Sequence, residues 1–511
     1  MKINSICILG GGTSGFATAS VLAKYRQTSG LKFDIKVVYS ENVGTIGVGE
    51  STLFAFNLLL KYLDLKDSDW MKECNATYKT SIRFENFYKK GTVFHYPFGT
   101  SDPHDTAGKL VDWHILKTLY PDIFTQETAA QFFLPQTLLS ERNKIGTDET
   151  YLDKNAAYHF DSKLLGEFLK KYSKERGVEV IDDTFYGTEQ DKYGNIESIV
   201  CDNGTYRADL FVDCSGFNSL LLGKTMSEEY IPFDKTLINN KSLAVKVPYK
   251  NKEKQLKNYT NCVALDNGWV WETPLWDSFA YGYVHTNRFA SEEEIEQEFF
   301  DYIGEEVDYR TINFKTGRYK RGWVKNVVAI GLSYGFIEPI ESTGIATTLS
   351  NIFGLLEYLS KRDMTVTRVD KDNFNYSIGT DIDRFRGFVE MHYYLSSRDD
   401  SPYWRYVTED VDYYWSDAFN VGYKQFMALC TDIRNFNADT VRELGPGGYN
   451  GIVFVALGMN YSSYSPAMIV AEGHNYEECK DHYLKYWKDL EKSIKKLPSS
   501  YQFLLKNVYN K

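Results

Sequence analysis

One short segment combines a carboxylate, two hydroxyls and a glycine directly before a helix-like pattern. It reads Glu341, Ser342, Thr343 and Gly344, and apolar residues then recur at helical spacing from Ile345. The first backbone N–H groups of a helix lack partners and carry partial positive charge, so they can bind a small anion. The ordinary alternative is a helix cap, because Ser and Thr commonly occupy that position. The segment therefore predicts either a capped helix start or an anion site beside a carboxylate.

A second candidate site is a glycine-rich turn near the start of the chain. It has the G-x-G-x-x-G spacing, with Gly10, Gly12 and Gly15 as its glycines and Thr13 and Ser14 between the last two. The first glycine allows a tight turn, the second lets a pyrophosphate approach the backbone, and the third lets the following helix pack closely. A dinucleotide on the helix start is therefore favoured over a chance glycine turn.

The elements around this turn form an expected βαβ unit. Residues 5–10 and 33–40 are apolar strands, and residues 15–27 between them have a helical pattern. Glu41 follows the second strand, where an acid can bind the adenosine ribose, but it comes two residues later than is usual. The sequence thus predicts a dinucleotide fold and leaves the ribose contact of Glu41 open.

Apolar strands that run into glycine turns recur much later, at residues 208–216 and 324–335. Parallel strands bring such turns to one edge of a sheet, so one sheet built from distant segments is expected. A further glycine loop follows the second strand at residues 42–53. Its candidate cofactor-binding residues are Gly47, Gly49, Glu50 and Ser51. The glycine loops at residues 42–53 and 208–216 could both close on a flavin dinucleotide, which favours FAD over NAD.

Between and after these segments the pattern changes. Residues 235–249, 258–275 and 278–287 alternate and are rich in aromatics, which predicts antiparallel strands on a substrate side. After about residue 375 the pattern is helical, including residues 410–430 and the amphipathic stretch 475–497. We therefore predict an α/β fold with two parts. Residues 1–375 would form a Rossmann-like FAD-binding core with a substrate-side sheet at about 85–140 and 230–320, and residues 376–511 a helical cap.

Composition excludes several classes of protein. The 511 residues carry a formal charge of −11, which disfavours nucleic acid as a partner. No apolar run approaches the about 20 residues of a membrane span, and the N-terminal apolar run reads as a strand and not as a signal peptide. Seven scattered cysteines without C-x-x-C spacing predict a reducing, cytoplasmic setting and no metal site. The aromatic content of 16% suits a planar ligand, although compositional drift would also explain it.

Six segments, in this order, resemble flavin-dependent halogenases of the tryptophan-halogenase group. They are GGGTSG, TIGVGEST, YHFDSKLL, DLFVDCSGF, GWVWETPL and AIGLSYGFIEPIESTGI. The resemblance runs from residue 1 to about residue 350 and continues weakly through residues 392–405. The family pattern W-x-W-x-I-P appears as Trp269, Trp271 and Pro274, with Thr273 in place of the isoleucine.

The resemblance implies a flavin monooxygenase type of fold and a reaction in two compartments. Reduced FAD, supplied by a separate flavin reductase, would react with oxygen and halide to give hypohalous acid, which then reaches an aromatic substrate elsewhere. The backbone N–H groups of Thr343 and Gly344 would bind the halide, with Ser342 adjacent, and Leu332 and Ile345 would contact the flavin. The sequence has no second glycine fingerprint as complete as the one at the N-terminus, which agrees with a separate flavin reductase.

Lys79 and Glu341 are the catalytic residues that the resemblance implies. A lysine can hydrogen-bond hypohalous acid or carry the halogen as a haloamine, and a nearby carboxylate can accept the ring proton. A lysine chosen without this context would be expected on the surface. The protonation state of Lys79 stays open, because a carboxylate favours the ammonium and burial favours the amine.

Aromatic side chains give the remaining substrate-side candidates. Tyr96 and Phe98 could stack on an indole or a phenol. Trp269 and Trp271 share one face of a strand and are either core residues or a wall between the compartments. Residues 445–460 lack the tryptophan with which the family clamps free tryptophan, so a free indole, a phenol or a larger aromatic is expected.

Two other classes of protein remain compatible with the sequence. One is a FAD-dependent monooxygenase or oxidoreductase that works without halide, and the other is a non-catalytic flavin-binding protein. The preferred halide, chloride, bromide or iodide, is left open. The oligomeric state is also left open, and a homo-oligomer is compatible with the sequence.

Overall fold

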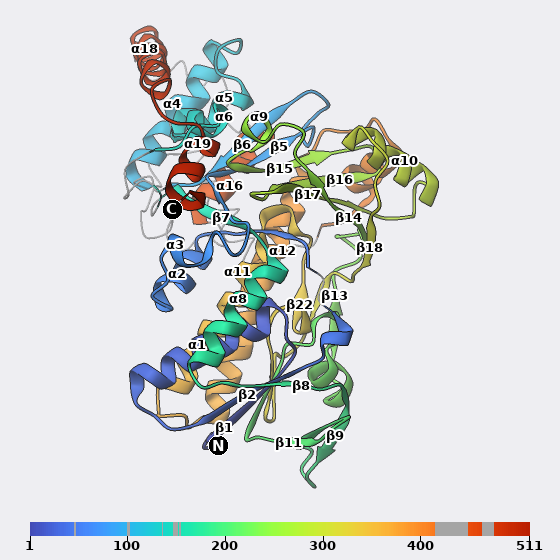
Figure 1. Cartoon of the computed structure of the whole chain (residues 1–511). Helices are drawn as coiled ribbons and strands as arrows, with labels where there is room; N and C mark the ends of the chain where they lie inside the picture. Colours follow the sequence, from blue (N-terminus) through green and yellow to red (C-terminus); the bar gives the residue numbers. More distant parts are fainter. Residues whose placement is uncertain are drawn as a thin grey trace. The chain divides into compact units, whose positions relative to one another are not determined.

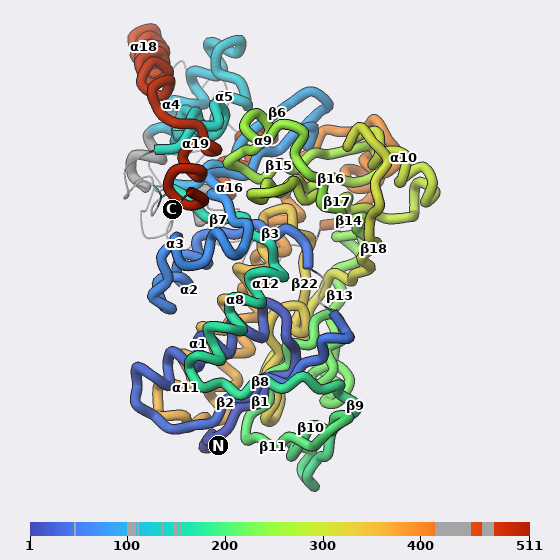
Figure 2. The backbone as a smooth tube through the Cα atoms, in the orientation of Figure 1, coloured from blue at the N-terminus to red at the C-terminus, as the bar shows by residue number. Residues whose placement is uncertain are grey.

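The structure is a computed structural model that describes residues 1–44, 47–99, 103–134, 136–146, 152, 155–413, 448–461 and 475–510. Internal contacts divide the chain into two compact units, each built from three separate stretches of sequence. The first unit comprises Met1–Ala76, Tyr158–Asn240 and Ile312–Ile382, and the second Thr77–Ala157, Lys241–Thr311 and Asp383–Lys511. In Figure 2 the backbone is coloured by residue number, so these separate stretches can be followed along the chain. The predicted grouping into residues 1–375 and 376–511 stays a prediction.

The first unit contains a six-stranded sheet made of distant segments. Its order is β20 (Trp323–Val324), β21 (Val327–Ala329), β12 (Leu210–Asp213), β1 (Ser5–Leu9), β2 (Asp34–Tyr39) and β8 (Glu179–Asp182). All neighbours are parallel except β20 and β21. The side chains of β12 and β21 are wholly buried, as expected of parallel strands covered on both faces. The predicted single sheet is confirmed.

Helices α1 (Thr13–Ser29) and α8 (Ser162–Glu175) pack against each other in this unit, next to the sheet (Figure 1). Their contact includes a buried pair of hydroxyls, Ser20 Oγ and Ser173 Oγ, which lie 2.9 Å apart. The unit also contains helices α2 (Ala55–Tyr62), α3 (Asp67–Trp70) and α11 (Thr343–Ser360), and the short 3₁₀ or π turns η1 (Glu41–Val43), η2 (Gly216–Asn218), η3 (Leu220–Thr225), η4 (Gly331–Ser333) and η5 (Pro339–Glu341). The helix expected after Gly344 is thus confirmed as α11.

Smaller sheets complete the first unit. Strand β3 (Gly49–Ser51) pairs with β7 (Ala157–Asp161) in antiparallel fashion. Two three-stranded sheets have the orders β11 (Thr205–Arg207), β10 (Ile196–Cys201), β9 (Phe185–Gln190) and β13 (Tyr230–Pro232), β19 (Gly317–Tyr319), β22 (Gly335–Phe336). Strand β3 matters for the site below, because it carries Glu50 and Ser51.

The second unit is built on a seven-stranded sheet. Its order is β18 (Arg310–Asn313), β14 (Lys241–Pro248), β17 (Ser278–His285), β16 (Gly268–Pro274), β15 (Tyr259–Ala264), β5 (Ser81–Glu85) and β6 (Val93–Pro97). Strands β14, β17, β16 and β15 pair in antiparallel fashion, as do β5 and β6, whereas β15 and β5 are parallel. The short strand β4 (Thr77–Lys79) precedes β5. The antiparallel strands predicted within residues 235–249, 258–275 and 278–287 are confirmed as β14, β15, β16 and β17.

Helices accompany this sheet in the second unit. They are α4 (Pro103–Leu119), α5 (Gln126–Phe133), α6 (Thr137–Glu141), α9 (Lys252–Gln255), α10 (Glu292–Ile303), α13 (Pro402–Arg405), η6 (Tyr406–Asp410), α16 (Gly448–Gly458), α18 (Tyr476–Ile494), α19 (Ser500–Leu504) and η8 (Leu505–Tyr509). Helix α12 (Arg368–Tyr394) contributes its first part to the first unit and the rest to the second. Most of the helical pattern expected at residues 410–430 lies outside the described residues. Within the described ranges, no helix is long and apolar enough to cross a bilayer.

Candidate active site

The glycine turn after β1 has the shape that a dinucleotide needs. Gly10 has a φ of 124°, and a Cβ placed on Gly15 would lie 2.0 Å from the Gly10 carbonyl oxygen. Only glycines allow this tight turn and the close packing of α1 on it. A Cβ on Gly12 would meet no atom within 4 Å, and no side chain caps α1. The turn therefore leaves open backbone, with bare helix N–H groups, where a pyrophosphate could bind.

Helix α8 supports this turn through side chains at helical spacing. The Thr13 hydroxyl donates to the Ser162 carbonyl at 3.0 Å, and Gly166 lies opposite the Thr13 backbone nitrogen. One turn further, the Lys170 ammonium lies 4.8 Å from the centroid of the Tyr39 ring. The face of α8 that carries residues 162, 166 and 170 thus extends from the glycine turn to the end of β2.

Lys170 and Tyr39 both contact Glu41. The Tyr39 hydroxyl donates to Glu41 Oε1 at 2.9 Å, and Lys170 Nζ lies 3.3 Å from the same oxygen. Hydrogen bonds from Tyr39 and then from Lys170 lower the pKa of the Glu41 carboxyl, so it stays ionised. The Glu41 side chain is 63% exposed and thus accessible to a ligand. Sequence reasoning missed Lys170, although the spacing of residues 162, 166 and 170 on one helix face was a readable signal.

The turn after β12 is fixed by a buried carboxylate. Asp213 accepts hydrogen bonds from Ser215 N and Oγ and from the N–H groups of Leu221 and Leu222. Burial raises the pKa of Asp213, and these hydrogen bonds act against that shift. The Ser219 hydroxyl then donates to the Ser333 carbonyl at 2.8 Å, which ties this turn to η4.

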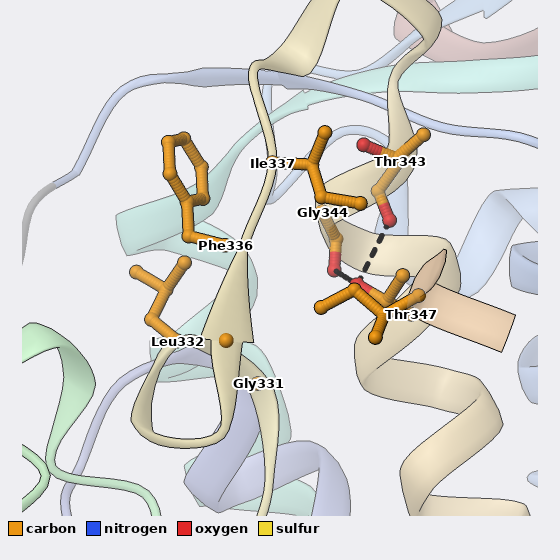
Figure 3. A pocket seen from close by; sticks show the side chains of 9 residues that line it. Gly331, Leu332, Phe336, Ile337, Thr343, Gly344 and Thr347 are labelled. Atoms are coloured by element: carbon orange, nitrogen blue, oxygen red, sulfur yellow. Dashed lines mark hydrogen bonds between the residues drawn. The ribbon is translucent and has the colours of Figure 1, made fainter. Parts of the chain in front are cut away.

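Turn η4 and the start of α11 line a pocket. Its wall consists of Gly331, Leu332, Gly335, Phe336, Ile337, Thr343, Gly344, Thr347 and Ile382. Figure 3 shows Leu332 and Phe336 on one side of the strand, whereas the Ile337 side chain lies on the other side, next to Thr343 and Gly344. A Cβ on Gly331 would lie 2.5 Å from the Ser14 hydroxyl, so this pocket adjoins the glycine turn. The structure therefore brings together Ser14, Leu332, Thr343 and Gly344, whereas Ile345 is buried in α11 and does not line the pocket.

Ser342 precedes α11 but does not cap it. Its φ and ψ are 57° and 36°, the left-handed conformation, and it forms no side-chain cap bond. Its hydroxyl instead donates to the Ser51 hydroxyl at 2.9 Å. The Thr347 hydroxyl donates to the carbonyls of Thr343 and Gly344, both at 3.0 Å, as the dashed lines in Figure 3 mark. The cap interpretation is therefore wrong, because the first N–H groups of α11 receive no side-chain acceptor from Ser342.

Two further carboxyl groups lie close in sequence to these elements. Glu341 is 1% exposed at the end of η5, immediately before Ser342. Burial raises the pKa of Glu50 on β3 to about 7, so near neutral pH its carboxyl group can also donate a hydrogen bond. Gly47, which precedes β3, has a φ of 51°, a conformation that favours glycine.

In the second unit, Lys79 is fully buried, so the surface interpretation of this lysine is wrong. Its ammonium nitrogen lies 4.9 Å from the centroid of the Phe98 ring, and Phe98 in turn meets Tyr96 edge to face at 5.9 Å. Phe388 of α12 and Phe454 of α16 also contact Tyr96. The structure thus brings three predicted residues, Lys79, Tyr96 and Phe98, into one aromatic cluster. A cation over a ring face is an attractive arrangement for the ammonium form.

Trp269 and Trp271 lie on the same face of the seven-stranded sheet as Tyr96. Trp271 lies opposite Cys262, Cys262 opposite Phe84, and Phe84 opposite Phe94, so these side chains share one face. Tyr96 is two residues after Phe94 on β6 and therefore lies on the same face. Both tryptophans are buried, and the Trp271 indole occupies the space where a Cβ on Gly282 would stand. They therefore pack in the core of this face, and a role as a wall between compartments stays a prediction.

The two residues predicted to be catalytic belong to different units. Glu341 and the pocket belong to the first unit, whereas Lys79 and its aromatic neighbours belong to the second. Each of the two side chains is withdrawn from bulk water, as their proposed roles require. Among the described residues, no group of His, Cys, Asp and Glu side chains is suited to a metal ion.

Known proteins share this sequence and fold. The chain matches the family described as tryptophan halogenase over residues 5–420. It is 33% identical over 427 residues to tryptophan 7-halogenase RebH of Lentzea aerocolonigenes, covering 79% of this chain and 78% of RebH. The solved structure of tryptophan 6-halogenase SttH of Streptomyces toxytricini is 28% identical, with a TM-score of 0.84 and coverage of 98% and 99%. The VirX1 apo structure is 37% identical, with a TM-score of 0.89 and coverage of 99% and 100%. The chain therefore belongs to the tryptophan halogenase family and is a flavin-dependent halogenase.

Proposed function

We propose that this enzyme uses reduced FAD, oxygen and a halide ion to halogenate an aromatic substrate through Lys79. The observation that carries the proposal is the uncapped start of α11, which faces a pocket shared with Leu332. An open helix start beside the expected flavin-binding turn is suited to a small anion that must react there. A hydroxylase would need no such anion site.

The residues present fit FAD. The open backbone at Gly12 and the bare N–H groups of α1 would hold the pyrophosphate, and Glu41 would bind the adenosine ribose. Leu332, on the pocket wall, and Gly47, Gly49, Glu50 and Ser51, on the loop and strand after β2, would contact the flavin end. When bound and reduced, the flavin supplies the two electrons with which oxygen is activated for halide oxidation.

The backbone N–H groups of Thr343 and Gly344 would hold the halide. Both residues line the pocket, and no side chain caps the helix that they begin. A helix start stabilises a negative charge through its partial positive charge and its free N–H groups.

Lys79 would pass the halogen to the substrate. Its amine can hydrogen-bond the oxygen of hypohalous acid or accept the halogen, and the Phe98 contact orients it. Glu341 would take the proton from the ring carbon once the halogen has been added. Burial of both side chains keeps water from consuming the oxidant.

The substrate would be a planar aromatic compound that stacks on Tyr96 and Phe98. RebH and SttH are tryptophan halogenases according to their names, whereas we propose a free indole, a phenol or a larger aromatic for this chain. A separate flavin reductase would supply reduced FAD. The expected cytoplasmic location remains a prediction.

The proposal is tested with a flavin reductase, NADH, FAD and oxygen, with and without bromide, against a panel of indoles and phenols. We expect products with the paired isotope pattern of bromine, formed only when bromide is present. Oxygenated products in the absence of halide would instead favour a monooxygenase. FAD binding without any oxygen-dependent product would favour a non-catalytic flavin-binding protein.

A first prediction concerns the FAD site. Replacing Lys170 by Met removes an ion pair and a hydrogen bond from Glu41 and leaves its carboxylate less well held. We expect the Kd for FAD to rise about three- to tenfold, the range of one hydrogen bond to a charged group. The measurement is a titration of the quenching of FAD fluorescence, and Glu41→Gln should have a similar effect.

Glu167→Gln is the matched control. Glu167 also pairs with Lys170, at 3.6 Å, but it has no contact with Tyr39 or Glu41 in the described structure. The Kd of the Glu167→Gln variant for FAD should therefore match that of the wild type. If Lys170→Met weakened FAD binding and Glu41→Gln did not, Lys170 would act directly on the cofactor phosphates. Unchanged FAD affinity in both variants would contradict the ribose assignment.

A further inference from the structure

The regular alternation of side chains does not continue from Lys79 into the strand that follows it. Strand β5 begins at Ser81, and its pairing with β6 places Ser81 and Tyr96 on opposite faces of the seven-stranded sheet. Regular alternation would place Lys79, two residues earlier, on the face of Ser81. Its ammonium nitrogen instead lies 4.9 Å from the centroid of Phe98, which contacts Tyr96. The alternation is therefore broken at Thr80, the residue between β4 and β5.

Thr80 uses each of its polar groups in a hydrogen bond. Its N–H and its hydroxyl both donate to the Asn258 carbonyl, at 2.7 and 3.0 Å, and its own carbonyl accepts the Phe98 N–H at 2.8 Å. The hydroxyl oxygens of Thr80 and Ser140 lie 2.7 Å apart. Because the single hydroxyl hydrogen of Thr80 points to Asn258, Ser140 is the donor in this pair. Both side chains are buried, so these bonds are shielded from water.

The partners of Thr80 belong to separate elements that are themselves held in place. Asn258 directly precedes β15, and its Nδ2 donates to the Lys144 carbonyl at 2.8 Å. Ser140 lies in helix α6. Since the Thr80 carbonyl also binds the residue after β6, three distant segments fix the peptide that follows Lys79. The direction in which the lysine leaves the backbone is thus set by Thr80 and its partners.

We infer that Thr80 is a positioning residue for halogen transfer, because it turns the chain so that the Lys79 amine faces Tyr96 and Phe98. The inference rests on the proposed role of Lys79 in halogen transfer. A reacting group that is misplaced by about 1 Å can lose about a hundredfold in rate. If the amine were misplaced in this way, hypobromous acid would still form but would escape into solution before it reached the aromatic substrate.

The main test is Thr80→Val, which replaces the hydroxyl by a methyl group. This methyl would lie 2.7 Å from Ser140 Oγ, whereas non-bonded atoms keep a separation of about 3.5 Å. The segment must therefore shift, although the bond of the residue 80 N–H can persist. Reactions contain bromide, the indole or phenol that the wild type brominates, and a water-soluble 1,3-diketone that traps hypobromous acid.

We expect the ratio of brominated aromatic product to brominated diketone to fall about ten- to a hundredfold in Thr80→Val. The sum of the two products should stay within about twofold of the wild type. Thr80 belongs to the second unit, whereas the glycine turn, the pocket and the start of α11 belong to the first. A shift in the ratio at a constant sum separates misplacement of Lys79 from a loss of oxidant production.

Two milder variants separate the hydroxyl from the volume of the side chain. Thr80→Ser keeps the hydroxyl, so its product ratio should stay within about twofold of the wild type. Ser140→Ala removes the hydrogen bond to the Thr80 oxygen without adding volume, and we expect a two- to tenfold lower ratio, about the worth of one hydrogen bond. Ser140→Ala also carries the test if Thr80→Val fails to fold, and an unchanged ratio in it would then overturn the inference.

Thr137→Val is the matched control. Thr137 is also buried in the second unit, and its hydroxyl donates to the Leu134 carbonyl at 2.6 Å. Thermal unfolding should show a lower Tm for this variant, as for Thr80→Val, because each loses a buried hydrogen bond. Only Thr80→Val should change the product ratio. In crystals of Thr80→Val, the distance from Lys79 Nζ to the Phe98 centroid should exceed the 4.9 Å of the wild type.

The inference is overturned if Thr80→Val keeps the wild-type product ratio or leaves Lys79 in place. It is also overturned if Thr80→Ser or Thr137→Val lowers the ratio as much as Thr80→Val does. Failure of the proposed function would look different, because Lys79→Met would then give the wild-type ratio. A changed ratio in Lys79→Met with an unchanged ratio in Thr80→Val would refute the role of Thr80 alone.

Discussion

Lys79→Met should abolish halogenation of the aromatic substrate while leaving FAD binding intact. Met nearly preserves the volume of the buried side chain and removes the amine that would transfer the halogen. We expect kcat to fall about a hundred- to ten-thousandfold, the usual contribution of a positioned proton donor or nucleophile. The measurement is the initial rate of brominated product by mass spectrometry, together with an FAD titration.

Lys117→Met provides the control for this variant. Lys117 lies in the same unit, and burial lowers its pKa to about 8, so it is also an amine in a poorly solvated position. Its Nζ donates to Asn460 Oδ1 at 2.6 Å, and we assign it no part in the reaction. Bromination should persist in Lys117→Met. If both variants lost activity equally, the effect would reflect stability or packing instead of halogen transfer.

Glu341→Gln should have the second largest effect. Gln keeps the shape of the buried side chain but cannot accept the proton that leaves the ring. We expect kcat to fall about a hundredfold or more, with an unchanged Kd for FAD. Rates with a substrate deuterated at the reacting carbon provide the diagnostic, because proton loss should become slower and an isotope effect on kcat should appear in the variant.

Glu338→Gln is the matched control for this carboxylate. Glu338 is equally buried, lies three residues earlier and accepts a hydrogen bond from Asn239 Nδ2 at 2.9 Å. The amide oxygen of Gln can still accept that bond, so activity should stay within a few-fold of the wild type. An isotope effect in Glu338→Gln as large as that in Glu341→Gln would contradict the specific role of Glu341.

Elements with strong local patterns could be predicted from the sequence. The apolar run of β1, the glycine turn and the helical spacing of α1 each fix local structure, and all three are confirmed. The same holds for α11, whose apolar residues recur at helical spacing after Gly344. Alternating polar and apolar residues in aromatic-rich segments likewise predicted strands β14 to β17, because one face of each strand is buried.

Contacts between distant segments could not be predicted in this way. Serine commonly caps helices, so a capped start of α11 was one of two alternatives, but the Ser342 N–H closes η5 on the Pro339 carbonyl and its hydroxyl donates to Ser51 instead. Lys79 has no sequence pattern that marks it as buried, and only the family resemblance singled it out. The spacing of residues 162, 166 and 170 shows that Lys170 shares a helix face, but its contact with Glu41 depends on the packing of α8 along the glycine turn, which is a tertiary relation.

The central claim is that halide oxidation and halogen transfer are separate steps, and that only the second needs Lys79. The most direct measurement follows where oxidised bromine goes in Lys79→Met, with an aromatic substrate and a soluble hypobromite trap present together. We expect the trap to be brominated while the aromatic substrate is not. Brominated aromatic product at close to the wild-type rate would contradict it.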